Sequence, residues 1–252
     1  MFLANEPVIR AAIGLGAGLI VGSFIATILI RWPKGRSIVS GRSACDACAA
    51  PLGPADLVPI LSWLVRRCRC RHCGARIDPL HPAIEAASAM VGLVALLGHP
   101  LPLGAVTALL GWWLLLAAAL DLEHQWLPDT LTLPLIPLGL LAGWAGFGPP
   151  LAERAAGAAI GWAALFAIAF LYKRLRGREG LGGGDPKLLG GIGAWIGAWN
   201  LPFVLLGAGL FGIAAIMLMR LRGEEVNATS RLPLGTLMIL AAWPIWLVAA
   251  AS

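Results

Sequence analysis

Two aspartates are the residues of this chain with the clearest potential for chemistry. Asp185 follows the glycine run Gly182-Gly183-Gly184 and opens an apolar stretch, and Asp121 ends another apolar stretch 64 positions earlier. A carboxylate is costly beside bilayer hydrocarbon, so an ionisable residue in such a place indicates a functional site. Two of them, each at the end of an apolar stretch, suggest an aspartyl pair that works at a membrane surface.

A second group that could do chemistry is formed by cysteines. Cys45-x2-Cys48 and Cys70-x2-Cys73 are separated by 21 residues, which is a spacing typical of a tetrahedral zinc site. The segment 32–83 that carries them has too small a core to fold well alone, so a bound metal would stabilise it. Four thiolates leave no open position for a substrate, and the predicted role of the zinc is therefore structural.

Several titratable residues near these groups leave alternatives open. Cys68 could replace Cys70 as a ligand, remain free or be oxidised, and His72 is more readily explained as a solvated side chain than as a ligand. Helix capping is the simpler role for Asp129. Glu123 and His124 could simply be solvated. Glu85 could contact substrate or another loop, or it could cap a helix.

The elements that must position these residues are membrane helices. The chain has 252 residues, of which 59% are hydrophobic and only 13% charged, and this is too apolar for a soluble domain. Most of its apolar stretches approach the roughly 20 residues that cross a bilayer as a helix. They cover residues 11–30, 84–98, 101–120, 130–148, 151–171, 187–199, 201–219 and 232–251. We predict an all-α polytopic membrane protein with about eight transmembrane helices, of which 84–98 and 187–199 are short and tilted or only partly inserted.

The positive charges predict how these helices are oriented. Of the 19 Lys and Arg residues, 17 fall in 31–83, in 173–187 or around the last connection at 220–231, and only Arg10 and Arg154 remain. Positive residues concentrate in cytoplasmic loops, so eight spans place both termini outside the cytoplasm and both Asp121 and Asp185 at the cytoplasmic face. A cytoplasmic position of 32–83 also argues against disulfides.

The net charge of +6 needs no nucleic-acid partner. Attraction to anionic lipid headgroups explains it, and no basic face interleaved with aromatic residues is present. The first apolar stretch differs from a cleavable signal because its positive charges follow it. We therefore predict three parts: an N-terminal transmembrane anchor at 1–31, a cytoplasmic zinc-binding loop domain with four cysteine ligands at 32–83, and a multi-helix transmembrane domain at 84–252 that carries both aspartates.

The order and spacing of the motifs carry a family resemblance. They are Gly22-Ser23-Phe24, Arg31-Trp32-Pro33, the paired cysteine knuckles with Pro59-Ile60-Leu61-Ser62-Trp63-Leu64 between them, His81-Pro82-Ala83-Ile84-Glu85, Asp121-Leu122-Glu123-His124-Gln125-Trp126-Leu127-Pro128-Asp129, Gly182-Gly183-Gly184-Asp185-Pro186-Lys187, Gly193-Ala194-Trp195-Ile196-Gly197 and Leu232-Pro233-Leu234-Gly235. Over nearly its whole length the chain resembles the bacterial type IV prepilin peptidases (prepilin leader peptidases), polytopic aspartic proteases of the G-x-G-D class.

The resemblance implies catalytic roles for the two aspartates. Asp121 matches the first catalytic aspartate of the family and Asp185 the second. Two carboxylates that share one site cannot both ionise cheaply, so one holds a proton. The ionised partner takes a proton from an attacking water, and the protonated partner polarises the carbonyl and later protonates the leaving amine. The sequence leaves open which aspartate holds the proton.

Three neighbours of Asp185 are expected to support it. Glycines such as Gly182 and Gly184 permit a positive φ and a close approach of the peptide main chain to the carboxylate. Lys187 could pair with an acidic group or a lipid phosphate, and its expected role is structural.

The resemblance also implies a substrate, a location and a second activity. Family members cleave basic leaders, usually after glycine, from type IV prepilins or type II secretion pseudopilins at the cytoplasmic face of the bacterial inner membrane. Some also N-methylate the new N-terminus from S-adenosylmethionine, which is left open here because no glycine-rich turn for that cofactor is present. The alternative class is a non-enzymatic zinc-binding scaffold or a transporter, although a transporter would place its charges nearer the midplane.

Overall fold

The computed structural model describes residues 6–38, 43–45, 47–178, 180–224 and 232–251 of the chain. Arg42 and Arg231, which were counted with the basic loops, lie outside these residues. Two compact units are present, residues 1–116 and 117–252. The predicted division at 31/32 and 83/84 stays a prediction.

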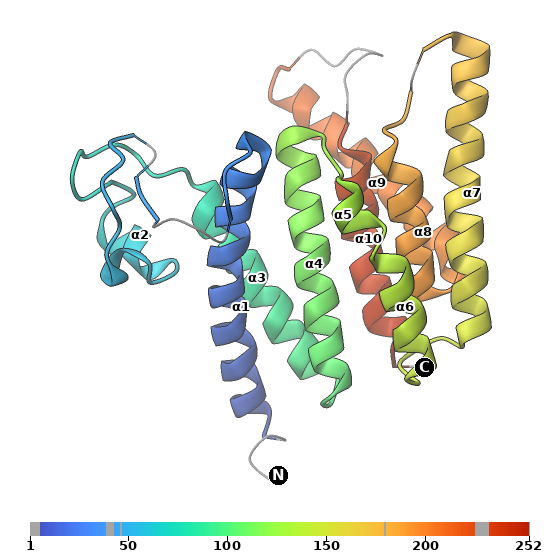
Figure 1. Cartoon of the computed structure of the whole chain (residues 1–252), viewed down its shortest axis with the longest axis horizontal. Coiled ribbons are helices and arrows are strands. Elements are labelled where there is room, and N and C mark those ends of the chain that lie inside the picture. The colour runs from blue at the N-terminus through green and yellow to red at the C-terminus, as the bar shows by residue number, and fades with distance from the viewer. Residues whose placement is uncertain (1–5, 39–42, 46, 179, 225–231, 252) are drawn as a thin grey trace. The chain divides into compact units, whose positions relative to one another are not determined.

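The first unit contains two long helices, a short one and the start of a third long helix (Figure 1). These are α1 (Pro7–Arg31), α2 (Leu61–Val65), α3 (Leu80–Gly98) and the first part of α4 (Leu103–His124). Short 3₁₀ turns occupy Trp32–Lys34 and Pro54–Asp56. Within the described residues no strand is found, and the two isolated antiparallel bridges, Ala44 with Pro51 and Arg69 with Arg76, both lie in the cysteine-bearing segment.

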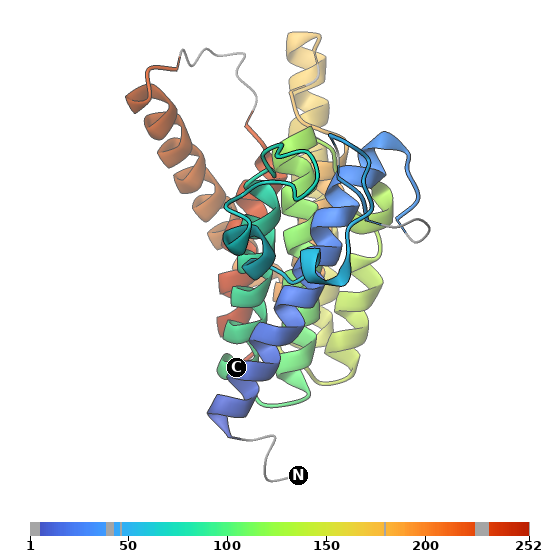
Figure 2. The same cartoon turned by 90° about the vertical axis from the view of Figure 1, so that its left-hand side faces the viewer.

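The second unit is built from the end of α4 and six further helices. They are α5 (Asp129–Thr132), α6 (Leu135–Trp144), α7 (Leu151–Arg176), α8 (Gly184–Ile196), α9 (Leu201–Leu221) and α10 (Leu234–Ala249), with a 3₁₀ turn at Ala198–Asn200 before α9. Figure 2 shows the same helices from the side. The predicted all-α membrane architecture is confirmed.

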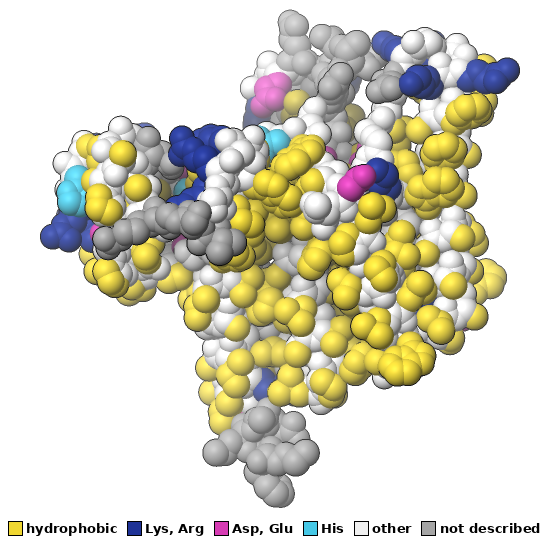
Figure 3. All heavy atoms as spheres, in the orientation of Figure 1, with side chains coloured by type: hydrophobic (Ala, Val, Ile, Leu, Met, Phe, Trp, Pro, Cys, Tyr) yellow, Lys and Arg dark blue, Asp and Glu magenta, His cyan; other side chains and the backbone are white. Residues whose placement is uncertain are grey.

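The helices differ in how far they could reach across a bilayer. Five of the described helices are long and apolar enough to span it: α1, α3, α4, α7 and α9. The predicted stretch 130–148 instead breaks into α5 and α6 at Pro134, because proline lacks the N–H that would continue the helix. The predicted stretch 187–199 is the 13-residue helix α8, which ends at Gly197 with φ +80°. Apolar side chains cover the outer faces of the long helices in Figure 3, as a lipid-facing surface requires.

Small residues allow α1 and α3 to pack at very close range. A Cβ on Gly14 would collide with the Gly92 carbonyl oxygen, and one on Gly18 would collide with the Ser88 carbonyl oxygen. A Cβ on Gly22, four residues further, would lie only 2.7 Å from the Cα of Glu85. Such a stripe of small residues is the usual means of helix association in lipid, where no hydrophobic effect drives helices together.

The same device holds α8 against α7 in the second unit. A Cβ on Gly157 would collide with the Gly193 carbonyl oxygen, and a Cβ on Gly161 would lie 2.6 Å from the Leu189 carbonyl oxygen. The position of α8 is therefore set by backbone-to-backbone contact, which leaves little freedom for the helix that begins with Asp185.

A fully buried arginine ties together the end of the second unit away from Asp185. The guanidinium of Arg154 donates to the carbonyl oxygens of Pro149 at 2.8 Å, Gly139 at 2.8 Å and Ala194 at 3.2 Å, and also to that of Phe147. Its Cζ lies 5.3 Å from the ring centroid of Trp246. A buried charge is tolerated only when its hydrogen-bond donors find acceptors. Here backbone carbonyl oxygens accept them, because the helical core offers few polar side chains, and the Trp246 ring adds a cation–π contact.

The contact at Gly18 gives a stability test with a control in the same helix. Gly18→Leu should lower the apparent melting temperature, because overpacking at a tight contact costs roughly 1–3 kcal/mol. Gly16→Leu should leave it unchanged, since no heavy atom lies within 4 Å of a Cβ at Gly16. Thermal unfolding of both variants in one detergent measures this. Equal melting temperatures would contradict the packing described.

Candidate active site

Asp121 lies in the last turn of α4 and is held by the start of α10. Its side chain is buried, and its Oδ2 accepts hydrogen bonds from the backbone N–H of Thr236 at 2.7 Å and from the Thr236 hydroxyl at 3.1 Å. The same hydroxyl lies 2.9 Å from the Ala118 carbonyl oxygen, so its single proton is shared between these two acceptors. A Cβ on Gly235 would lie 2.9 Å from the carboxylate oxygen, so a glycine is needed there for α10 to approach.

Asp185 lies in the first turn of α8 and is also buried. Its Oδ2 accepts the backbone N–H of Gly182 at 3.0 Å. None of the glycines from Gly182 to Gly184 has a positive φ, so that part of the expectation is wrong. Gly184 is needed for space instead, because a Cβ there would lie 2.7 Å from the Cβ of Leu127.

Leu127 connects the surroundings of the two aspartates. It packs against Gly184 at the start of α8, and its Cδ1 would meet a Cβ on Gly235 at 2.6 Å at the start of α10. The end of α4 and the starts of α8 and α10 therefore converge around one leucine. The carboxyl groups of Asp121 and Asp185 are brought close enough to interact electrostatically.

The two buried carboxyl groups differ in the number of hydrogen bonds that they accept. Each uses its Oδ2 to accept hydrogen bonds, two from Thr236 for Asp121 and one from Gly182 for Asp185. Both aspartates lie at helix N-termini, Asp185 in the first turn of α8 and Asp121 against the start of α10, where the helix dipole favours negative charge. Such an arrangement allows one of two neighbouring carboxyl groups to hold a proton while the other is ionised.

Lys187 and Asp129 form an ion pair next to this site. The Lys187 Nζ lies 2.6 Å from Asp129 Oδ1 and so links α8 to α5. The expected capping role of Asp129 is not observed, because Pro128 is the N-cap residue of α5 and no side chain caps it. Both side chains are substantially exposed, so the pair contributes at most about 1 kcal/mol and acts mainly on geometry. Glu123 and His124 are exposed, in line with a solvated position.

Glu85 has a clear partner within the first unit. Its side chain is buried on α3, and its Oε2 accepts the backbone N–H of Ile60 at 2.7 Å. Ile60 has a φ of +58°, so this hydrogen bond fixes a turn that the backbone does not favour. Among the alternatives for Glu85, the structure shows the contact with another loop.

The four predicted cysteine ligands lie together. The Sγ atoms of Cys45, Cys48, Cys70 and Cys73 are all within 4.8 Å of one another. Four sulfurs bonded at about 2.3 Å to a tetrahedral zinc are separated by about 3.8 Å, so this cluster fits a metal ion closely. Backbone N–H groups of Cys73 and His72 lower the pKa of the Cys70 thiol to about 6, which favours the thiolate form.

The remaining candidates lie outside this cluster. Among the described residues, the group that could hold a metal contains neither Cys68 nor His72. The hairpin that carries Cys70 and Cys73 is closed by the hydrogen bond from the Cys70 N–H to the Ala75 carbonyl at 2.8 Å. Tight turns of this kind deliver two thiolates each, as the spacing predicted.

Sequence reasoning did not identify all the residues that shape the candidate site. Gly235 was identified only as part of a sequence motif, and neither Thr236 nor Leu127 was predicted to contact the surroundings of the aspartates. The signal that could have found Gly235 is its place near the start of the last apolar stretch, two residues after Pro233. Nothing in the sequence pairs Thr236 with Asp121, since 115 positions separate them.

Two family models match successive parts of this chain. Residues 17–98 match the Bacterial Peptidase A24 N-terminal domain, and residues 108–217, which contain both aspartates, match the Type IV leader peptidase family. No solved structure matches the chain significantly.

Curated relatives cover most of the chain. A prepilin leader peptidase/N-methyltransferase of Pseudomonas aeruginosa is 33% identical over 96% of this chain and 91% of its own length. A protein of the same name from Stutzerimonas stutzeri is 32% identical over 96% of this chain and 92% of its own length. Another, from Aeromonas salmonicida, is 38% identical over 80% of this chain and 69% of its own length. With these matches, the chain belongs to the type IV leader peptidase family, and it is a membrane peptidase.

Proposed function

We propose that this peptidase removes the basic leader peptide of type IV prepilins or type II secretion pseudopilins, with Asp121 and Asp185 as its catalytic pair. The observation that carries the proposal is the convergence of these two buried carboxyl groups at three helix ends, within the segment that matches the family. The printed names of the relatives, which include a type 4 prepilin-like leader peptide-processing enzyme of Escherichia coli, support this substrate class. A non-enzymatic scaffold or a transporter is not favoured.

The reaction proposed for the pair is hydrolysis of one peptide bond. The ionised carboxylate removes a proton from a water, whose oxygen bonds to the scissile carbonyl carbon while the protonated carboxyl group donates to the carbonyl oxygen. Collapse of this intermediate breaks the C–N bond, and the leaving nitrogen takes a proton from the pair. Because each Oδ2 accepts hydrogen bonds from the protein, the proposal assigns each Oδ1 to the water and the substrate.

The basic helix ends support an orientation with the pair at the cytoplasmic face of the inner membrane. Arg31 ends α1, the last turn of α7 carries Lys173, Arg174 and Arg176, and that of α9 carries Arg220. The connection from α7 leads directly to Asp185, so the positive-inside rule places this residue towards the cytoplasm. With eight crossings, in which α6, α8 and α10 cross in addition to the five long helices, both termini are extracytoplasmic.

The metal proposed for the four cysteines is a structural zinc ion. Cys45, Cys48, Cys70 and Cys73 supply four sulfurs and so leave no open coordination position, and the chemistry is left to the aspartates. When bound, zinc would hold two knuckles of a segment whose described residues before α3 form one short α-helix and two 3₁₀ turns. The relatives' names also include N-methyltransferase, and N-methylation with S-adenosylmethionine is an activity that remains to be tested for this chain.

Loss of either aspartate should abolish cleavage. Asp121→Asn and Asp185→Asn should each lower kcat/KM for a prepilin by at least about 100-fold, the range expected when a general acid or base is removed. Glu123→Gln, which changes an exposed carboxylate two residues away, should retain activity. Mass spectrometry of the product N-terminus, in lipid and with S-adenosylmethionine present, reads cleavage and any added methyl group together. Equal cleavage by all variants would refute the catalytic pair.

The hydroxyl of Thr236 should affect turnover more than binding. Thr236→Val removes one of two donors to Asp121 Oδ2, and a hydrogen bond to a charged group is worth about 1.5–3 kcal/mol, or roughly 10- to 100-fold in kcat. Thr236→Ser keeps the hydroxyl and should stay within about threefold of wild type. Steady-state kinetics separates kcat from KM. An unchanged kcat in Thr236→Val, or an equal loss in both variants, would contradict this role.

Removal of one cysteine ligand should release the metal. Cys48→Ser should abolish zinc binding and make segment 43–78 sensitive to protease, because the metal supplies much of the stability of such small domains. Cys68→Ser is the matched control and should bind zinc as wild type does, since Cys68 lies outside the cluster. Elemental analysis of the purified proteins measures the metal content. Zinc retained in Cys48→Ser but lost in Cys68→Ser would reverse the ligand assignment.

A further inference from the structure

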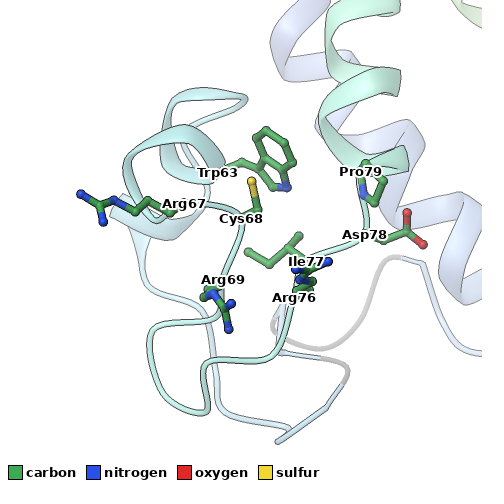
Figure 4. Close-up of a pocket in the computed structure, with 8 residues that line it drawn as sticks. All are labelled: Trp63, Arg67, Cys68, Arg69, Arg76, Ile77, Asp78 and Pro79. Atoms are coloured by element: carbon green, nitrogen blue, oxygen red, sulfur yellow. The ribbon is translucent and has the colours of Figure 1, made fainter.

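A pocket of about 610 Å³ lies in the first unit, between the turn after α2 and the segment that leads into α3 (Figure 4). All of its lining residues come from the segment 63–79. None of them belongs to the proposed metal cluster or to the aspartyl pair. The role of this pocket is therefore a separate question from the peptidase chemistry.

Two arginines face each other at this pocket. Arg69 and Arg76 form an isolated antiparallel bridge that flanks the second cysteine knuckle. Opposite residues of such a bridge project on the same side with Cβ atoms about 5 Å apart, and like charges placed there repel. Figure 4 shows both side chains among those that line the pocket.

The described residues provide no carboxylate that neutralises this pair. Arg69 donates to the Gly74 carbonyl oxygen at 3.3 Å, which orients its guanidinium without balancing its charge. Asp78 also lines the pocket, but its Oδ1 accepts the Leu80 N–H at 2.9 Å and its carboxylate points away from the arginines in Figure 4. Neither Arg69 nor Arg76 has an ion pair within the described part of the chain.

The walls of the pocket are fixed and partly apolar. Trp63 and Cys68 line one side, and Ile77 and Pro79 the other. The Cys68 N–H donates to the Trp63 carbonyl at 2.9 Å, and the Ile77 N–H donates to the Cys68 carbonyl at 2.8 Å, so backbone hydrogen bonds join both sides. Buried Nε1 of Trp63 has no acceptor among the described residues, which adds an unused donor to the same wall.

Strained backbone builds one side of this pocket. Arg67 and Cys68 have φ angles of +51° and +64°, a conformation that side chains other than glycine rarely adopt. The turn closes α2 and directs the following residues, Cys68 and Arg69, to the pocket, while the Arg67 side chain points outward in Figure 4. Strain of this kind is kept where a local geometry is needed.

We propose that this pocket binds a phosphate ester, with Arg69 and Arg76 holding the phosphate and the apolar wall holding the group attached to it. Paired guanidinium groups match phosphate oxygens through forked, charge-assisted hydrogen bonds. A bound phosphate would also remove the repulsion between the two arginines. The pocket ends at Pro79, directly before α3, which is long and apolar enough to span a membrane.

That position brings two sources of the phosphate within reach. Basic pockets next to a transmembrane helix commonly bind anionic phospholipid headgroups, while a soluble phosphate ester could enter from the aqueous side. Either ligand would brace the second cysteine knuckle against the start of α3. The proposal does not rest on the peptidase function.

The test compares three probes on the full-length, zinc-loaded protein. Inorganic phosphate and glycerophosphoglycerol are titrated calorimetrically against protein in phosphatidylcholine nanodiscs, and phosphatidylglycerol binding is followed by native mass spectrometry. Arg69→Gln/Arg76→Gln should weaken binding by at least about 10-fold, because two charge-assisted contacts to the phosphate are lost. Arg36→Gln/Arg71→Gln changes the net charge equally at exposed positions outside the pocket, and should stay within about twofold of wild type.

Each outcome decides the proposal. Binding of the soluble ester that depends on the arginine pair supports a phosphate site open to water, and pair-dependent binding of lipid alone identifies the headgroup as the source. Equal loss in the pair variant and the control, or no binding of any probe by wild type, overturns it. Zinc content checks that each variant is folded. If Arg69→Gln disturbs the neighbouring Cys70, the single variant Arg76→Gln replaces the double variant, and it should also bind the phosphate probes more weakly than the control does.

Discussion

The structure depends on burying two carboxyl groups at the end of a membrane helix bundle. Burial of a charged group without compensation costs many kcal/mol, so the surroundings of Asp121 and Asp185 must supply hydrogen bonds that the lipid cannot. Thr236 supplies them to Asp121 from the start of α10, and Gly182 supplies one to Asp185 from the turn that precedes α8. The candidate site is thus a meeting point of helix ends, where unpaired backbone N–H groups are available for this purpose.

Close helix packing is the second requirement, since the pair works only if its helices keep their positions. Gly157 and Gly161 let α7 approach the backbone of α8, and Gly184 and Gly235 make room for Leu127 between the starts of α8 and α10. At the opposite end, Arg154 joins the carbonyls of Gly139 and Ala194. The same unit is therefore fixed at both ends, by glycine contacts and by one buried cation.

Much of this could be predicted from the sequence, because the signals were local. Apolar length indicated the helices, paired CxxC spacing indicated the cysteine cluster, and the ends of two apolar stretches indicated the aspartates. What could not be predicted depends on which helices touch. The pairing of Thr236 with Asp121 and the enclosure of Arg154 join residues that carry no mutual signal. An acidic partner for Lys187 was expected, but the sequence did not identify it as Asp129. The positive φ expected at the glycines before Asp185 failed because these glycines are needed for space, not for backbone conformation.

The central claim is that Asp121 and Asp185 act as one catalytic unit, and non-additivity tests it most directly. Residual cleavage would be measured under enzyme excess for Asp121→Asn, Asp185→Asn and the double variant, with zinc content as the folding check. If the two carboxyl groups share one task, the double variant is no slower than the slower single variant, because the second substitution removes nothing that still works. A loss in the double variant equal to the product of the two single losses would show independent roles and contradict the shared site.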